Sequence, residues 1–199
     1  MTKRLTFILL LLFYLAVSAS PSPGAQTFSD LGGFDATVGN WAVELKDMVT
    51  ERFERALAQG RITEAQLFDT FYVPIPNTTP QKFNTKSDKF IDETTQTLLD
   101  AFLKKDKRLR FVVIVDRNGY LPTHNSKFTM PLTGNPDVDT QQNRTKRIFN
   151  DRTGLAAARN LEPYLLQSYS RDTGETMKDL SVPIMIKGLH WGALRFGYQ

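Results

Sequence analysis

The sequence predicts an α+β domain in which a long N-terminal helix precedes a five-stranded antiparallel sheet, with a helical and loop insert after the second strand. Three observations predict it. Apolar residues recur at alternating steps of three and four from Asp30 to Gln59, which is a helical period. The β-branched run Leu109–Val115 is typical of a central strand, and the C-terminal part of the chain contains three strand-like segments separated by turns.

Residues 1–25 are typical of an export signal followed by a spacer. A positively charged start leads into the apolar stretch Leu5–Val17, which is shorter than the ~20 residues that span a bilayer. Small residues follow, so we expect cleavage after Ala19 or, beyond a Pro/Ser/Gly spacer, after Ala25. The sequence therefore predicts a periplasmic or secreted protein with a single domain over residues 26–199. An uncleaved membrane anchor is the alternative.

Charge and cysteine content exclude several partners and chemistries. The full chain has 25 basic and 21 acidic residues, and loss of Lys3 and Arg4 with the signal leaves a net charge of about +2. This charge is too small to favour a nucleic-acid partner. The chain has no cysteine, so it forms no disulfide and offers no thiol nucleophile.

The first half of the domain is predicted to be mainly helical. The helix over Asp30–Gln59 carries an apolar stripe close to a heptad repeat, which suits packing against the protein's own sheet or against a second copy in a homodimer. A short helix is expected at Thr63–Asp69, an extended loop at the proline-rich segment Val73–Pro80, and another helix at Ser87–Lys104.

The second half is predicted to build the sheet. Asn118-Gly119 is a strong hairpin signal after the first strand, so Tyr120–Asn125 is expected to return beside it as the second strand. The insert, Ser126–Asn160, is expected to begin as a loop and to contain a short helix at Asn143–Phe149. The last three strands are expected in "PYLLQSYS", "TMKDLSVPIMI" and "LHWGALRFGY".

Catalytic motifs are missing from the sequence. The chain has no Gly-rich phosphate loop, no nucleophile elbow and no zinc-binding histidine pair of the H-E-x-x-H type. The tripeptide Asp172-Thr173-Gly174 matches that of aspartic proteases, but Arg171 and Glu175 flank it between two strands, which is typical of a surface turn. We therefore expect no enzyme, no catalytic residue and no bound metal.

Polar and aromatic side chains near strand ends predict a site for a small molecule. Tyr120 and His124 share one face of the second strand if that strand is regular, and Asn125 follows them. In the last strand Trp191 and Arg195 share one face, where an indole beside a guanidinium can stack an organic ligand and bind its carboxylate.

The alternative for this pair is structural, with Arg195 bound to Asp179 or Asp116 and Trp191 simply in the core. Tyr169 on the preceding strands and Arg147 in the insert are further candidates for the same cavity. His124 or His190 can ligate a haem iron through a neutral imidazole, although the spacing does not demand haem.

Five stretches carry a family resemblance: "LFDTFYVPIP", "VDRNGYLPTHN", "NRTKRIFNDRTGLAAARN", "LLQSYSRDTGETMKDLSVPI" and "HWGALRFGY". Over Arg61–Tyr198 the chain resembles the PAS-like, single Cache-type sensor domain of bacterial methyl-accepting chemotaxis proteins. The resemblance implies a long helix behind a twisted antiparallel sheet, and a pocket for a small ligand, or sometimes haem, on the other face of the sheet.

These observations favour an exported sensor domain that binds a small ligand without catalysis. The insert Ser126–Asn160 is expected to close over the ligand as a flap and to pass the change through the sheet to the N-terminal helix. The family's signalling coiled coil is not part of the sequence, so we expect a membrane receptor or kinase as partner. Two alternatives stay open: a haem or gas-binding protein, and a protein-docking module without a ligand.

Overall fold

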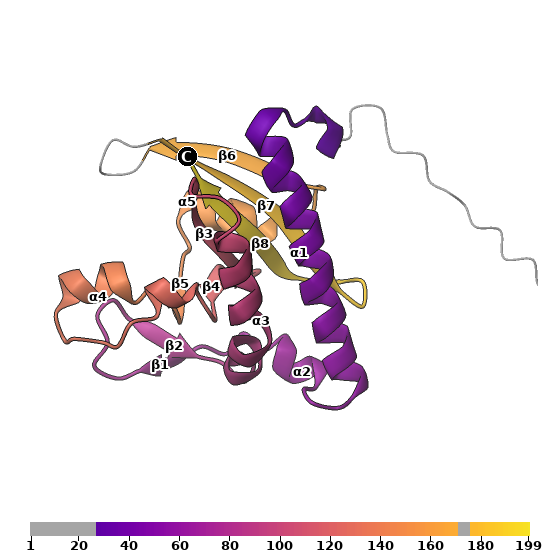
Figure 1. The fold of residues 1–199 in the computed structure, drawn as a ribbon. Helices are drawn as coiled ribbons and strands as arrows, with labels where there is room; N and C mark the ends of the chain where they lie inside the picture. The colour runs from indigo at the N-terminus through magenta and orange to yellow at the C-terminus, as the bar shows by residue number, and fades with distance from the viewer. Residues whose placement is uncertain (1–26, 171–175) are drawn as a thin grey trace, which may run out of the picture.

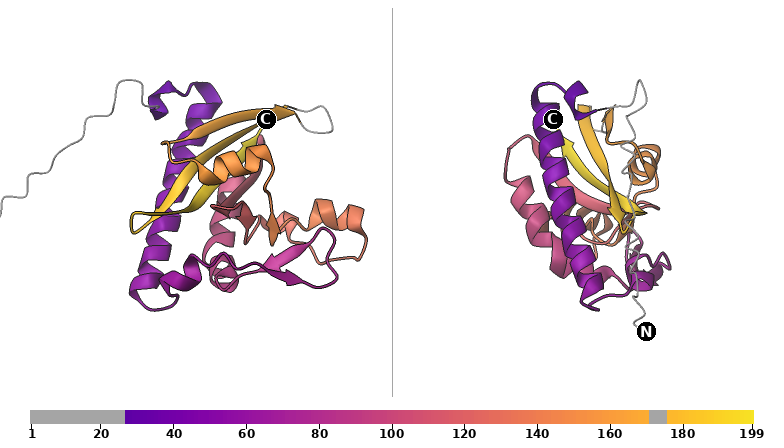
Figure 2. Two further views of the ribbon diagram at one scale, coloured as in Figure 1. Left: turned by 180° about the vertical axis from the view of Figure 1, so that it is seen from behind. Right: turned by 90° about the vertical axis from the view of Figure 1, so that its right-hand side faces the viewer.

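The computed structural model describes residues 27–170 and 176–199. The predicted export signal at 1–25 and the turn containing Asp172-Thr173-Gly174 lie outside the described residues. Four long strands form an antiparallel sheet in the order β3-β8-β7-β6. Helices α1 and α3 cover one face of this sheet, and α5 with the insert covers the other (Figures 1 and 2). The α+β class with a long N-terminal helix is confirmed.

The described chain contains helices and strands with the following bounds. The helices are η1 (Phe28–Asp30), α1 (Gly33–Ala58), α2 (Glu64–Leu67), α3 (Asp88–Leu103), η2 (Ser126–Phe128), α4 (Pro136–Gln142) and α5 (Arg152–Arg159). The strands are β1 (Val73–Ile75), β2 (Lys82–Asn84), β3 (Leu109–Asp116), β4 (Tyr120–Leu121), β5 (Arg147–Ile148), β6 (Leu165–Ser170), β7 (Thr176–Ile186) and β8 (Leu189–Tyr198). No helix in the described ranges is long and apolar enough to cross a membrane.

The apolar stripe of α1 packs against the protein's own sheet. Val38, Leu45, Val49 and Phe53 are fully buried, in one core with the helix-facing residues of β7 and β8. Each such side chain contributes about 1.5–3 kcal/mol when it is withdrawn from water. Of the two packings that the stripe suits, the structure therefore has the intramolecular one.

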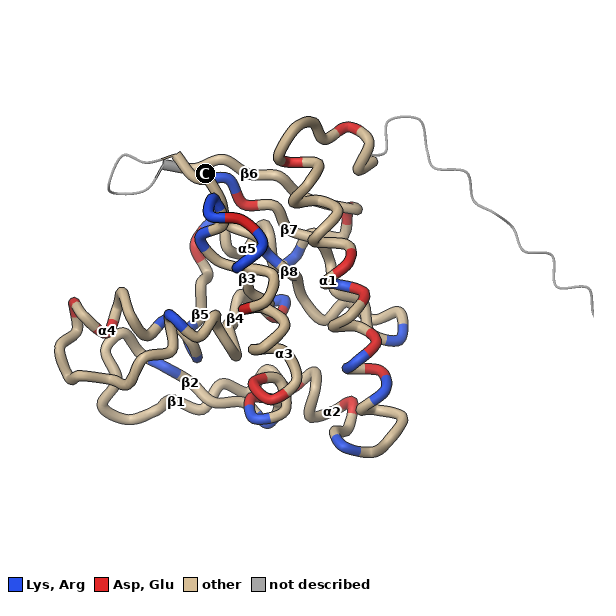
Figure 3. The backbone as a smooth tube through the Cα atoms, viewed as in Figure 1, with Lys and Arg blue, Asp and Glu red and all other residues tan. Residues whose placement is uncertain are grey.

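The opposite face of α1 is polar. Its exposed residues are mainly polar or charged, and acidic and basic residues alternate along the helix (Figure 3). They include Thr37, Asn40, Glu44, Asp47, Glu51 and Arg55. A homodimer through α1 would therefore have to use charged side chains, because the apolar stripe is already buried.

A β-bulge in β8 changes the predicted orientation of one aromatic residue. Ile184 of β7 pairs with Gly192, whereas the next residue, Met185, pairs with His190, so Trp191 is the extra residue. One extra residue inverts the alternation of side chains beyond it. Gly192 is required at this point, because a Cβ there would lie 2.0 Å from the carbonyl oxygen of Val115.

The predicted second strand does not join the main sheet, which has four strands. The carboxylate of Asp116 accepts hydrogen bonds from the amides of Asn118 (2.8 Å) and Tyr120 (2.9 Å) and directs the chain into a turn. The backbone of β4 then pairs with β5, where the amide of Phe149 donates to the carbonyl of Gly119 at 2.8 Å. The predicted β3-β4 pairing is therefore wrong, because a segment distant in sequence takes the backbone groups of β4.

The insert also differs from its prediction. A helix starts at Pro136 in the expected loop, because the side chain of Asn135 caps it by accepting from the amide of Asp137 at 3.0 Å. The expected helix at Asn143–Phe149 is instead a turn at residues 145–146 followed by β5. The Nζ atom of buried Lys82 donates to the carbonyls of Asn143 (3.1 Å) and Thr145, which a helix would have used internally.

Candidate ligand-binding site

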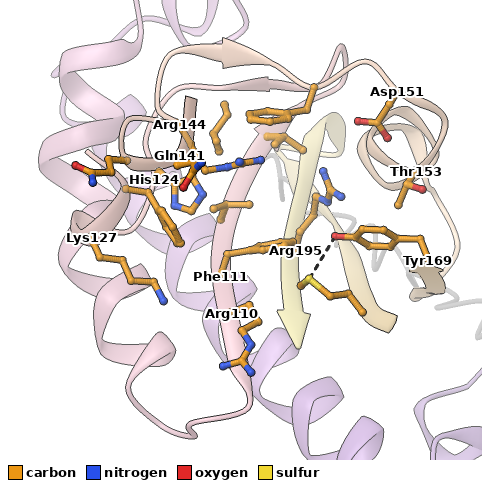
Figure 4. Close-up of a pocket in the computed structure, with 17 residues that line it drawn as sticks. Arg110, Phe111, His124, Lys127, Gln141, Arg144, Asp151, Thr153, Tyr169 and Arg195 are labelled. Carbon is orange, nitrogen blue, oxygen red and sulfur yellow. Dashed lines mark hydrogen bonds between the residues drawn. The ribbon is translucent and has the colours of Figure 1, made fainter. Parts of the chain in front are cut away.

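A cavity of about 920 Å³ lies on the face of the sheet that points away from α1. The sheet forms one wall with side chains of β3, β6, β7 and β8, and the insert with α5 forms the other (Figure 4). The lining residues are Arg110, Phe111, Val113, Val115, Leu121, His124, Lys127, Phe128, Gln141, Gln142, Arg144, Phe149, Asp151, Thr153, Tyr169, Met177 and Arg195. A volume of this order is typical of pockets for small organic molecules.

The inner part of the cavity is apolar. Val113, Val115 and Leu121 are buried in a small cluster separate from the main core, and Phe111 and Phe149 pack against this cluster. The cluster exists because β3 is buried on both faces, so alternate residues of its apolar run point to the helical side, where α3 packs on β3, and to the cavity. This surface can accept the hydrocarbon part of a ligand.

Arg195 lies at the base of the cavity and forms an ion pair with Asp179 of β7. Its Nε atom is 3.1 Å from Oδ2 of Asp179, and the side chains of Arg195 and Asp179 are 9% and 0% exposed. Burial opposes the charged guanidinium, but the adjacent carboxylate of Asp179 outweighs burial and raises the pKa of Arg195. Of the two interpretations of this residue, the ion pair with Asp179 is present, so its charge is already balanced.

His124 reaches the cavity as a neutral imidazole. Its Nδ1 atom accepts a hydrogen bond from the amide of Asn125 at 2.7 Å, which places the proton of the neutral ring on Nε2. Burial, together with the positive charges of Arg144 and Lys127, lowers the pKa of His124 to about 3. The ring lies between Phe111 and Phe128, with centroid distances of 6.5 Å and 4.6 Å.

Positive charge dominates the lining. The cationic side chains Arg110, Lys127, Arg144 and Arg195 face one lining carboxylate, that of Asp151. The side chain of Asp151 also accepts a hydrogen bond from the amide of Gly154 at 3.0 Å as the cap of α5. Even with Asp179 balancing Arg195, cationic side chains outnumber carboxylates among the described lining residues.

Three of the seven sequence-predicted site residues line this cavity: His124, Tyr169 and Arg195. Trp191 does not, because the bulge turns it to the other face of the sheet. Its ring lies edge-on to Phe53 at 5.7 Å, and its Nε1 donates to the carbonyl of Leu67 at 2.9 Å. The predicted pairing of Trp191 with Arg195 on one face is therefore wrong.

The other three predicted site residues, Tyr120, Asn125 and Arg147, form hydrogen bonds within the segments around the cavity. The hydroxyl of Tyr120 donates to the carboxylate of Asp88 at 2.9 Å, and Oδ1 of Asn125 accepts from the amide of Val112 at 2.9 Å. Arg147 donates to the carbonyl of Thr140 at 3.2 Å, and burial lowers its pKa to about 10. These bonds fix the start of α3, the edge of β3 and the end of α4.

The structure adds lining residues that the sequence pattern did not single out. The added aromatic and cationic residues are Arg110, Phe111, Lys127, Phe128, Arg144 and Phe149. Arg110 and Phe111 belong to β3, where Arg110 had a weak signal because it is the one charged residue in an otherwise apolar run. The other four belong to the insert, whose sequence has no clear period that would show which side chains point inward.

The histidines do not fit the ligation of a haem iron. Iron-ligating histidines donate the proton of their second nitrogen to an acceptor, but Nδ1 of His124 is itself an acceptor and the proton lies on Nε2. His190 is not among the cavity residues, and its Nε2 is buried without a hydrogen-bond partner. Within the described residues, no group of three or more His, Cys, Asp or Glu side chains is arranged to hold a metal.

Comparisons with known proteins found only distant similarity. No family model matches the chain, and no curated protein matches it. An extracellular ligand binding receptor from Desulfohalobium retbaense DSM5692 is similar over 80% of this chain and 25% of that chain, with 12% identity and a TM-score of 0.39. A C-terminal domain from Streptococcus mutans is similar over 65% of this chain and 92% of that chain, with 12% identity and a TM-score of 0.31. The chain thus spans about a quarter of the length of the Desulfohalobium receptor.

Proposed function

We propose that this protein is an exported, non-catalytic binding domain that holds a small organic molecule in the cavity between β3, β8 and the insert, in the manner of a Cache-type sensor. One observation carries the proposal: a cavity of about 920 Å³ joins an apolar wall to several polar and charged side chains. Such a combination is typical of small-molecule sites. The signal-like residues 1–25 support a periplasmic or secreted location.

The chemistry of the lining supports binding more than catalysis. A general base needs a pKa near the working pH, but the pKa of His124 is about 3 and its Nδ1 is occupied. Asp151 caps α5, and Arg195 is paired with Asp179. The described lining therefore contains no nucleophile paired with a base.

A route from the cavity to the helical face supports a sensory role. The amide of Ser126, at the start of the insert, donates to Oδ1 of Asp100 on α3 at 2.9 Å, and the hydroxyl of Ser126 also donates to this carboxylate. The main chain at His124 is linked to α3 through Gln96 at 3.4 Å. Movement of the insert over a ligand would thus pull on α3, which packs beside α1.

We propose that a membrane receptor or kinase reads this movement from the helical face. Chemotaxis is the process favoured by the sequence resemblance described above. On this proposal α1 contacts the partner through its polar outer face, since its apolar stripe is buried against the sheet.

A thermal-shift screen of a metabolite library with the full chain tests the binding function. We expect one chemical class to raise the melting temperature of the wild type. The substitution Thr153→Trp should fill the cavity and abolish the shift, whereas Thr153→Val, which keeps the size of the side chain, should retain it. An equal shift in wild type and Thr153→Trp would place the ligand elsewhere, and a library without any stabilising class would contradict the function.

A further inference from the structure

Two cations at one end of the cavity have no carboxylate partner among the residues that the structure describes. We call Arg110 and Lys127 the mouth pair, since both line the cavity and both are exposed to solvent. Arg110 donates from Nε to Oε1 of Gln199 at 2.7 Å and from Nη1 to the carbonyl of Lys107 at 3.3 Å, which are neutral acceptors. Neither residue forms an ion pair with any carboxylate of the described chain.

The two charges of the mouth pair act on each other. Lys127 is partly withdrawn from water, with its Nζ 4.9 Å from the ring centroid of Phe128. Burial and the nearby charge of Arg110 lower the pKa of Lys127, although Asp100 works in the opposite direction. An anion between the two side chains would relieve this repulsion and give both cations a negatively charged hydrogen-bond acceptor.

An aromatic slot continues inward from the mouth pair. Phe111 follows Arg110 on β3, Phe128 follows Lys127 on η2, and the ring of His124 lies between the two phenyl rings. Neutral His124 adds no charge to this slot, which leads on to the apolar cluster around Val113 and Val115. A molecule with an anionic end and an apolar body would match both parts at once.

Arg195 is less suited to this role than the sequence pattern suggests. A ligand carboxylate that took the guanidinium of Arg195 would leave the carboxylate of Asp179 buried without its partner. Loss of a partner from a buried ion pair is strongly unfavourable. The mouth pair can bind an anion without such a loss.

We propose that the ligand is an organic anion, with its carboxylate or sulfonate between Arg110 and Lys127 and its apolar body in the slot of Phe111, His124 and Phe128. This inference rests on the proposed function and names the ligand class for the same cavity. It predicts that selectivity lies at the mouth and that the base of the cavity contributes shape.

Two fluorescent probes with one skeleton test the charge requirement. 1-Anilinonaphthalene-8-sulfonate and N-phenyl-1-naphthylamine differ only in the sulfonate, and both fluoresce when withdrawn from water. We expect the wild-type full chain to bind the sulfonate at least about tenfold more tightly than the neutral amine, because only the sulfonate can accept charge-assisted hydrogen bonds from the mouth pair. The double variant Arg110→Gln/Lys127→Gln should lose about tenfold for the sulfonate and less than about twofold for the amine.

The control has the same net charge as the double variant but changes side chains that do not line the cavity. Lys104→Gln/Lys107→Gln removes two exposed charges that do not line the cavity and should leave both affinities unchanged. Thr153→Trp should block both probes, which places them in the cavity, and circular dichroism checks that each variant is folded. Equal binding of the two probes by the wild type, or equal losses in the double variant and its control, would overturn the anion preference alone. Failure of both probes to bind the wild type would overturn the binding function as well.

Discussion

The guanidinium of Arg195 on β8 lies against the carboxylate of Asp179 on β7, with Nε 3.1 Å from Oδ2, and both side chains are shielded from water. The pair lies at the base of the cavity. Without Asp179, the sheet would hold the charge of Arg195 buried and without a counter-charge. Phe111 covers the guanidinium from β3, with its ring centroid 5.9 Å from Cζ. This relationship makes Arg195 primarily a structural residue of the cavity base.

Removal of one member of this pair should be much more harmful than removal of both. Arg195→Met leaves Asp179 charged and buried, and we expect it to lower the free energy of unfolding by about 3–5 kcal/mol. The double variant Arg195→Met/Asp179→Leu should recover most of this loss, because the uncompensated charge is gone. Urea denaturation followed by circular dichroism measures both. Equal stability of the single and double variants would show that the two charges are not coupled.

His124 should make the protein sensitive to mild acid. Its pKa is about 3 in the folded protein and 6.5 in the unfolded chain, so between these values the unfolded state holds one more proton. Its contribution to stability is therefore complete above pH 6.5 and is lost as the pH falls toward 3. The slope of the unfolding free energy between pH 6 and 4.5 should be smaller in His124→Asn by about 1.4 kcal/mol per pH unit.

The two histidines of the chain allow a direct check of that assignment. Asn can replace Nδ1 of His124 with an amide oxygen that still accepts from Asn125, so the variant should fold. In the NMR spectrum of the wild type, the imidazole resonance that His124→Asn removes should not titrate above pH 5. A midpoint near 6.5 for this resonance would contradict the buried, neutral state.

Lys82 should make the stability of the protein depend on pH in the alkaline range. Burial, helped by the charge of Arg147, lowers its pKa from 10.5 to about 8, so between these values the unfolded chain again holds more protons. The charge of Lys82 therefore disfavours folding below pH 8, and stability should rise as the pH increases from 8 toward 10. Lys82→Met should remove this rise by up to about 1.4 kcal/mol per pH unit. An identical pH slope in the two proteins would show that Lys82 titrates normally.

Most of the fold could be predicted because most of its elements bury one regular face. The stripe of α1 and the side of α3 that carries Ile91 and Leu98 follow a helical period set by the core, and the continuous apolar run of β3 indicates a strand buried on both faces. The last three strands were found for the same reason. The partner of β4 could not be predicted, because Asn118-Gly119 is a local signal, whereas the pairing depends on Arg147 and Ile148 far along the chain.

The site was less predictable than the fold. Arg195 was placed in the cavity by strand alternation and Tyr169 by its position on a preceding strand, and both residues line the cavity. Trp191 was misplaced because alternation fails across a bulge, and the glycines at 192 and 197 of the last strand do not show by themselves where the bulge lies. The mouth pair was missed because Arg110 is an exposed charge at the start of β3 and Lys127 is an exposed charge in the insert, and no period separates either of them from other surface charges.

Trp191 lies on the helix-facing side of the sheet, so its substitution should affect the stability of the protein and not the affinity of the cavity for a ligand. Trp191→Phe keeps an aromatic ring against Phe53 but loses the hydrogen bond to the carbonyl of Leu67, and should lower the unfolding free energy by about 1 kcal/mol. Its affinity for 1-anilinonaphthalene-8-sulfonate should stay within about twofold of wild type. Phe111→Leu, in contrast, should lower the affinity for this probe more than about fivefold, because it removes an aromatic ring that contacts the probe in the slot. A Trp191→Phe variant with normal stability and weak probe binding would place the indole in the cavity. That result would contradict the assignment of Trp191 to the helix-facing side of β8.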